Sequence, residues 1–205
     1  MTERDSLARR IGEPYFLFLM FVGVGLGTVL VRQNVRLTLL WAVLVLLSVL
    51  FRSAHQVEFT FSSSNLLRGA LLGLVISVPV LVFLSDQLRS FTERLYATED
   101  VVMLFYQVCF VSAPAEEYFF RGIVQSRKGA WVSSGLYAVA ALLYFLPRAP
   151  LLALGVAVVM GVLGVVYAFV CENHGLVASV ACHLVVGFTL QVVPSIIATV
   201  RTMLA

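Results

Sequence analysis

The chain has 205 residues, of which 60% are hydrophobic and only 12% are charged, and its mean hydropathy is +0.98. Soluble domains usually carry about 25% charged residues. These values exclude a disordered chain, a collagen-like chain and an ordinary soluble enzyme, and they indicate a polytopic membrane protein. The net charge of +3 comes with no basic cluster and no RNA-binding motif, so we expect no nucleic-acid partner.

Seven stretches of the chain contain no Asp, Glu, Lys or Arg. A helix of about 20 mostly apolar residues crosses the hydrocarbon core of a bilayer, and continuous rather than alternating apolar runs favour helices over a β-barrel. We therefore predict an all-α, polytopic transmembrane helix bundle with about seven spans, in one membrane domain covering residues 1–205. The predicted spans are 15–31, 37–51, 69–85, 101–115, 129–147, 149–171 and 173–200.

Polar segments separate these predicted spans. Residues 52–67 form a serine-rich connection, and residues 85–100 are the most polar segment of the chain. Within the latter, Leu88, Phe91 and Leu95 are spaced three and four apart, which predicts a short amphipathic helix at the membrane interface. The Lys and Arg residues divide eight to six between the two sides of a seven-span topology, which favours a cytoplasmic N-terminus.

An acidic pair lies at the end of the fourth predicted span. Glu116 and Glu117 follow an Ala-Pro-Ala sequence, and Arg121 lies four residues beyond Glu117. Residues i and i+4 share a helix face, so Glu117 and Arg121 can pair, whereas Glu116 is rotated by about 100° and can point elsewhere. Ionisable groups at membrane depth are costly and mark functional sites, although an ion pair at a helix end among headgroups fits the same residues.

Two more polar residues occur in the later apolar runs. His183 lies well inside the last run, where it could be a general acid or base, a metal ligand, or a core histidine bonded to a backbone carbonyl. Arg148 follows a charge-free run and lies between Pro147 and Pro150, which predict a helix end. An arginine that snorkels to the membrane surface fits this position on local grounds.

These motifs resemble those of the CAAX-processing and bacteriocin-processing (CPBP, or Abi) family of intramembrane proteases. The sequence Glu116-Glu117-x-x-x-Arg121 is similar to the first family motif, EExxxR. Residues 161–183, in which a small-residue span leads to a glycine turn and then to a helix carrying His183, resemble the last two core helices of that family.

The resemblance covers about residues 100–190 and implies a polytopic α-helical fold with a membrane-embedded cavity. It implies peptide-bond hydrolysis, either near the C-terminus of prenylated proteins or on peptides and sorting signals in bacteria. The implied partners are a peptide or protein substrate, the lipid bilayer and a membrane partner protein. A bacterial member would be an integral protein of the inner membrane.

The resemblance also assigns roles by position. Glu116 would be the base that activates water, with Glu117 and Arg121 as a supporting pair. His183 would stabilise the oxyanion or bind a metal, and Glu116 and His183 are the candidate ligands of a divalent ion such as zinc. A carboxylate in a dry site can act as a general base, and a donor fixed opposite it stabilises developing negative charge.

The sequence departs from the family pattern at two positions. Arg148 stands where the second motif, FxxxH, has its histidine, with Tyr144 at the Phe position, and Gly187 stands where the third motif has asparagine. Arginine neither binds a metal nor accepts a proton, so Arg148 could only pair with Glu116 or clamp an oxyanion. Glycine lacks the oxyanion donor, which is typically worth about 10²–10³ in rate.

Three hypotheses about function follow. The first is an intramembrane endopeptidase with an altered site that uses Glu116 and His183. The second is a catalytically weak or inactive relative that keeps the cavity to bind a peptide or a partner protein. A transporter or channel, the third, is disfavoured because the chain shows no repeat symmetry and no pair of broken helices.

Overall fold

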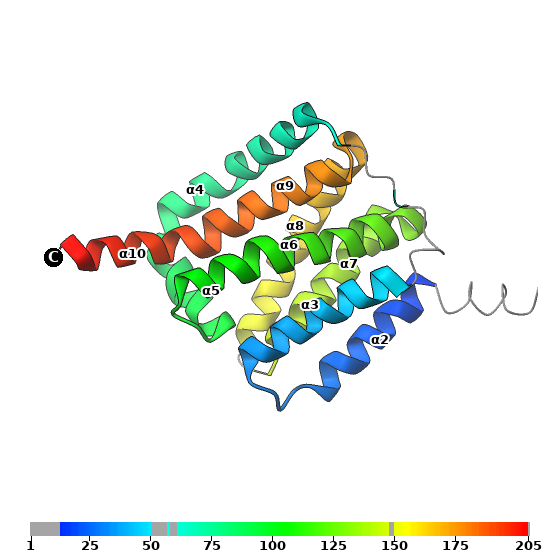
Figure 1. The fold of residues 1–205 in the computed structure, drawn as a ribbon, viewed down its shortest axis with the longest axis horizontal. Coiled ribbons are helices and arrows are strands. Elements are labelled where there is room, and N and C mark those ends of the chain that lie inside the picture. Colours follow the sequence, from blue (N-terminus) through cyan, green and yellow to red (C-terminus); the bar gives the residue numbers. More distant parts are fainter. Residues whose placement is uncertain (1–12, 51–56, 58–60, 148–149, 205) are drawn as a thin grey trace, which may run out of the picture.

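The computed structural model describes residues 13–50, 57, 61–147 and 150–204, and all regular secondary structure in these ranges is helical (Figure 1). The predicted all-α fold class is confirmed for this part of the chain. Arg148, which we placed at the second family motif, lies outside the described residues.

The helices form a bundle in which segments distant in sequence lie side by side (Figure 1). Three segments, labelled η, have the wider turns of a π-helix. In chain order the elements are α2 (Pro14–Gly27), α3 (Gln33–Leu50), α4 (Ser63–Tyr96), α5 (Val101–Phe105), η2 (Tyr106–Ser112), α6 (Ala113–Glu117), η3 (Tyr118–Gln125), α7 (Ser126–Phe145), α8 (Pro150–His174), α9 (Leu176–Gly187), η4 (Phe188–Val192) and α10 (Val193–Leu204).

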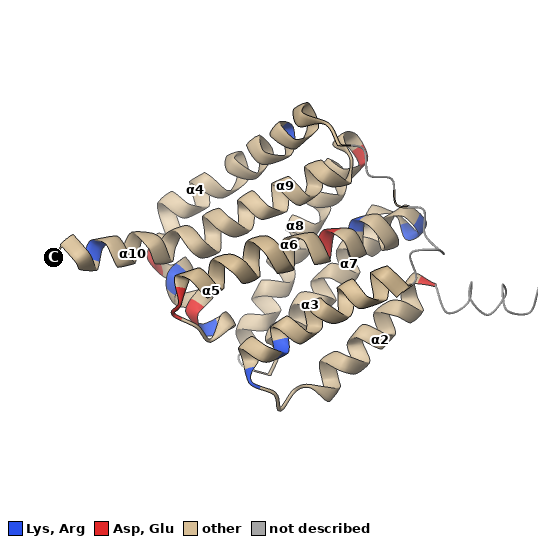
Figure 2. Cartoon of the chain, viewed as in Figure 1, with Lys and Arg blue, Asp and Glu red and all other residues tan. Residues whose placement is uncertain are grey.

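Four helices of the described part are long and apolar enough to cross a membrane: α3, α4, α8 and the continuous helix Leu176–Leu204 that α9, η4 and α10 form. The other three predicted spans fall on α2, on the helix that runs through α5 and α6, and on α7, which do not meet the same test of length and composition. Charged residues gather towards the ends of the helices, and a further red segment with a blue one beside it lies between the labels α6 and α7 (Figure 2). The chain is therefore an integral membrane protein with four candidate spans, and the total of seven stays a prediction.

A row of small residues lets α4 approach α9 closely. Gly69, Gly73 and Ser77 are spaced by four, so they share one face of α4, and all three are buried. A Cβ on Gly69 would overlap the carbonyl oxygen of Ala178, and one on Gly73 would lie 2.8 Å from the carbonyl oxygen of Cys182. Small residues at this spacing are typical of closely packed membrane helices. The contact fixes the position of α9, the helix that carries Ser179 and His183.

The helix α4 changes direction before its last three turns. Pro79 lies inside α4, and Leu84 has non-helical dihedral angles of φ −127° and ψ 20°. Proline removes a backbone hydrogen bond and is a common cause of bending in helices. The segment after the bend is the one for which we predicted an amphipathic helix, and its apolar residues Leu88, Phe91 and Leu95 line an internal cavity.

A buried arginine of α3 joins three helices. The guanidinium group of Arg36 donates hydrogen bonds to the carbonyl oxygens of Gly25 at 2.8 Å, Leu143 at 2.7 Å and Tyr144 at 2.8 Å. The side-chain amide of Gln33 donates to the same Tyr144 oxygen at 2.9 Å. The last carbonyls of a helix have no partner within it, so these bonds complete the C-terminal turns of α2 and α7. They also fix the position of Tyr144 beside the site described next.

Candidate active site

The acidic pair and the histidine lie beside π-helical segments. Glu116 and Glu117 end α6, which lies between η2 and η3, and His183 lies on α9 just before η4. π-Helical turns are frequent at functional sites because they shift the direction of the side chains that follow. α6 packs against α9, so the acidic pair and the imidazole meet inside the bundle.

The four residues of the predicted site are brought together and are almost completely buried. Their exposed fractions are 2% for Glu116, 0% for Glu117, 2% for Arg121 and 5% for His183. Buried ionised groups are tolerated only when they are paired or hydrogen-bonded. The partners of each charge therefore decide what the cluster can do.

Both oxygens of Glu117 are engaged. The Nδ1 atom of His183 lies 3.0 Å from Oε1, while Oε2 lies 2.5 Å from the hydroxyl of Ser179 and 3.6 Å from the Nε atom of Arg121. Because an ionised carboxylate only accepts hydrogen bonds, the Nδ1 atom of His183 carries a proton in this arrangement. Glu117 thus orients the imidazole as well as neutralising the arginine.

Arg121 is held between aromatic rings. Its Nη1 atom donates to the Ser133 hydroxyl at 2.7 Å, and that hydroxyl donates to the Phe120 carbonyl at 2.6 Å. The guanidinium carbon lies 5.1 Å from the ring centroid of Tyr137 and 6.0 Å from that of Tyr167. Cation–π contact with both rings stabilises a positive charge that has no access to water.

The ring of His183 is held in place by aromatic stacking, and its Nε2 atom has two polar neighbours. It stacks on Tyr167, with ring centroids 4.6 Å apart and an interplanar angle of 15°. Its Nε2 atom lies 3.4 Å from the Tyr137 hydroxyl and 3.9 Å from the Oε2 atom of Glu116. The nitrogen that Glu117 does not bind therefore faces the first glutamate of the pair.

Glu116 has one engaged and one open oxygen. Its Oε1 atom accepts hydrogen bonds from the indole of Trp41 at 2.7 Å and from the hydroxyl of Ser112 at 3.1 Å. Its Oε2 atom is buried and has no hydrogen-bond partner among the described residues. The buried hydroxyl of Tyr144 also has no hydrogen-bond partner among the described residues. The open oxygen marks the place where a proton could be taken up.

A largely apolar cavity of about 500 Å³ reaches the imidazole. It lies between α4, α8 and the helix formed by α9 and η4, and His183, Tyr167 and Gly187 belong to its wall. Glu116 is not among the lining residues, so a molecule in this cavity meets His183 first. A cavity with few polar groups among many apolar ones is the usual form of a site for hydrophobic ligands.

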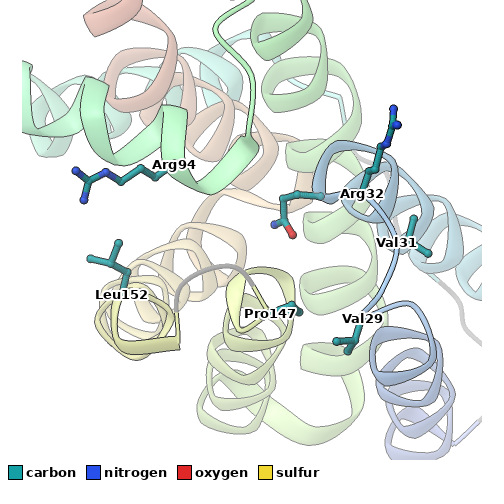
Figure 3. A pocket seen from close by; sticks show the side chains of 7 residues that line it. Val29, Val31, Arg32, Arg94, Pro147 and Leu152 are labelled. Carbon is teal, nitrogen blue, oxygen red and sulfur yellow. The ribbon is translucent and has the colours of Figure 1, made fainter.

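A second cavity, of about 610 Å³, lies at one end of the bundle (Figure 3). Its wall includes Arg32, Arg94 and Pro147 but none of the four predicted site residues. Figure 3 shows the side chains of Arg32 and Arg94 extending away from each other. The arrangement does not converge on a common ligand, so the candidate site remains the cluster around His183.

The residues present do not fit a metal centre. In the described ranges no group of three or more His, Cys, Asp and Glu side chains is arranged to hold a metal ion. Of the two predicted ligands, Glu116 uses Oε1 for Trp41 and Ser112, and His183 uses Nδ1 for Glu117. Zinc sites in proteins take at least three protein ligands, so no step is assigned to a metal here.

The glycine at the third-motif position is closely covered by a neighbouring helix. Gly187 is buried, and a Cβ built on it would lie 2.8 Å from the Cγ1 atom of Val108 on η2. Real Cβ atoms essentially never come so near another atom. The absence of an asparagine here is therefore coupled to the packing of η2 against α9.

Several contact residues were missed by the sequence analysis. Ser179 is spaced by four from His183, so helical periodicity could have indicated it. Ser133 shares a helix face with Tyr137, but neither residue was part of a predicted motif. Trp41 could not have been found in this way, because it lies 75 residues from Glu116 and no local pattern connects the two. Sequence spacing identified the charges, and the structure adds the neutral donors that hold them.

Comparison with known proteins supports the family resemblance. Residues 98–189 match the family model described as type II CAAX prenyl endopeptidase Rce1-like. No curated protein and no solved structure matches the chain. The matched region contains the acidic pair, Arg121 and His183. Residues 98–189 are thus an Rce1-like domain, which supports membership of the CPBP family of intramembrane proteases.

Proposed function

We propose that this protein is an intramembrane endopeptidase in which Glu116 activates a water molecule. The observation that carries the proposal is the open Oε2 atom of Glu116, which is buried and faces the Nε2 atom of His183 at 3.9 Å. A general base needs a carboxylate oxygen that no protein donor occupies. The Rce1-like domain and the apolar cavity beside His183 support a peptide substrate.

The spacing of these two atoms suits a shared water molecule. Two polar atoms 3.9 Å apart are too distant for a direct hydrogen bond, but each can lie about 2.8 Å from one water oxygen. In the proposed reaction Glu116 takes one proton of the water, and the water oxygen bonds to the carbonyl carbon of the peptide. The carbon–nitrogen bond then breaks, and the leaving amine takes the proton from Glu116.

Glu117 and Arg121 support this step without touching the substrate. Glu117 binds Nδ1 of His183 and so directs Nε2 towards the reacting atoms. With a proton on Nε2, His183 becomes an imidazolium that offsets the charge of Glu116, while Arg121 offsets that of Glu117. A fixed N–H donor at this point would stabilise the oxyanion.

The proposed substrates are hydrophobic or lipid-modified peptide segments, such as C-terminal or sorting segments of membrane-associated proteins. The wall of the cavity is mainly leucine, valine and phenylalanine, which favours apolar chains over charged ones. We also propose that the protein lies in the bacterial inner membrane and crosses it seven times. The N-terminus would be cytoplasmic, an orientation that the distribution of Lys and Arg supports.

The test is cleavage by the full-length protein in lipid nanodiscs. Two pools of internally quenched peptides serve as probes, one with a farnesylated cysteine followed by three randomised residues and one of unlipidated hydrophobic peptides. We expect cleavage in one pool by the natural sequence and a loss of at least about 10³-fold for Glu116→Gln. Glu99→Gln, which changes an exposed carboxylate, is the matched control and should keep full activity.

A catalytically inactive relative that binds a peptide is the second candidate, and Gly187 favours it because the third-motif donor is absent. This candidate predicts that both pools remain uncut while the unlipidated or farnesylated peptides still bind, as measured by fluorescence anisotropy. Cleavage that survives Glu116→Gln would contradict the glutamate mechanism itself.

A further inference from the structure

The site needs a hydrogen-bond donor on the wall of α9 beyond His183. The expected position is Gly187, one turn after His183, but it has no side chain, and Val108 leaves no space for one. A second donor to the substrate carbonyl, in addition to the N–H of His183, must therefore come from another residue near the same turn of the helix. The need for this donor rests on the proposed endopeptidase function.

Gln191 lies on the same face of this helix. His183, Gly187 and Gln191 follow one another at intervals of four, and all three line the cavity of about 500 Å³. Side chains on a helix lean towards its N-terminus, so a residue covers the surface of the preceding turn. The long side chain of Gln191 accordingly extends over the turn of Gly187, where the missing donor would lie.

The carbonyl end of this amide is already held. The Tyr96 hydroxyl donates a hydrogen bond to the Oε1 atom of Gln191 at 2.7 Å. Since Oε1 is engaged, the amide nitrogen Nε2 is the free end, and it donates no hydrogen bond to any residue in the described ranges. The two N–H groups of Nε2 remain for a ligand in the cavity.

Tyr96 connects this amide to the acidic pair. The ring of Tyr96 stacks on Trp41 with centroids 6.3 Å apart, and the indole of Trp41 donates to Glu116. Tyr96 is almost fully buried, so its hydroxyl has a defined direction. One aromatic pair therefore orients both the proposed base and the amide of Gln191.

We propose that Gln191 is a catalytic residue whose side-chain amide donates a hydrogen bond to the carbonyl oxygen of the scissile peptide bond. It takes the place of the donor that Gly187 lacks. No bond of Gln191 is made or broken in the reaction. The amide stabilises the negative charge that develops on the substrate oxygen when water adds to the carbonyl carbon.

Gln191→Glu gives the sharpest test because its carboxylate still accepts the Tyr96 hydrogen bond but has no N–H to donate. Gln191→Met has a similar size and loses both functions. We expect both variants, in nanodiscs and with the fastest peptide of the two pools, to lower kcat by about 10²-fold or more with KM changed less than about threefold. Tyr96→Phe keeps the stacking and should lower kcat less, by about tenfold, because the amide loses only its orientation.

Thr202→Met is the control, since Thr202 is an exposed polar residue of the same continuous helix and lies outside the cavity, so the rate should not change. Thermal unfolding in detergent checks that each variant is folded. If the natural sequence cleaves and Glu116→Gln does not, while both Gln191 variants keep kcat, only the role of Gln191 is overturned. If the natural sequence cleaves neither pool, the endopeptidase function and the role of Gln191 are both overturned.

Discussion

The Nδ1 atom of His183 lies 3.0 Å from the Oε1 atom of Glu117. Two adjacent glutamates on a helix point about 100° apart, so they can have different partners although they are neighbours in sequence. Glu117 is fully engaged by His183, Ser179 and Arg121, whereas Glu116 keeps an open oxygen. The proposed function rests on this division, with Glu117 as the positioning carboxylate and Glu116 as the base.

Removing the charge of Glu117 should strongly destabilise the protein. Glu117→Gln leaves the guanidinium of Arg121 buried without a counterion, and breaking such a pair costs about 3–5 kcal/mol. The double variant Glu117→Gln with Arg121→Met removes both charges and should recover most of that loss. Unfolding in mixed detergent and SDS micelles measures the free energies, and the double-mutant cycle gives the coupling.

The rate of peptide cleavage by the double variant shows whether the pair of Glu117 and Arg121 also has a role beyond stability. We expect the double variant to be folded but still slow in peptide cleavage, because Glu117 no longer fixes His183. A double variant with full stability and full activity would show that orientation of the imidazole by Glu117 does not matter for catalysis. The experiment therefore tests a positioning role independently of folding.

The indole N–H of Trp41 should affect the rate of cleavage through its hydrogen bond to Glu116. Trp41→Phe removes the indole N–H that donates to the Oε1 atom of Glu116 while keeping an aromatic ring beside Tyr96. A hydrogen bond to a charged group is worth about 1.5–3 kcal/mol, so kcat should fall by about 10–100-fold with little change in KM.

The other tryptophan of the chain provides the control for that change. Trp131 is 78% exposed, so Trp131→Phe should leave the rate of cleavage unaltered. Equal rates for both variants would mean that the indole bond does not orient Glu116 during the reaction.

The charged residues of the candidate site are easier to recognise in the sequence than its neutral residues. Charges at membrane depth are rare, so Glu116 and His183 were visible in the sequence without any structural information. Arg36 was not recognised, because its partners are backbone carbonyls of Gly25, Leu143 and Tyr144, which no side-chain pattern reveals. Span number was the weakest prediction, since charge-free windows do not distinguish a crossing from a helix buried inside a bundle.

Gly187 should be intolerant of even one methyl group. The helix propensity of alanine exceeds that of glycine by about 0.8–1.0 kcal/mol, but a Cβ at this position would lie 2.8 Å from Val108. Overpacking costs about 1–3 kcal/mol, so Gly187→Ala should be destabilising overall.

Adding Val108→Ala makes space for the new Cβ, and the double variant should be more stable than the sum of the two single effects predicts. Additive effects in SDS unfolding would show that the two helices are less closely packed than the structure has them.

Gly69 should be the most sensitive glycine in α4. A Cβ there would overlap the carbonyl oxygen of Ala178, which is part of a helix backbone and cannot rotate away. Gly69→Ala should therefore separate α4 from α9 and cost about 3 kcal/mol, at the upper end of the range for overpacking.

Gly135→Ala is the matched control on α7, because nothing lies within 4 Å of its Cβ position, and it should stabilise the protein by about 0.5–1 kcal/mol. Since α9 also carries His183, Gly69→Ala should lower peptide cleavage along with stability, whereas Gly135→Ala should leave cleavage unchanged. Equal stability of the two variants would contradict the close approach of α4 and α9.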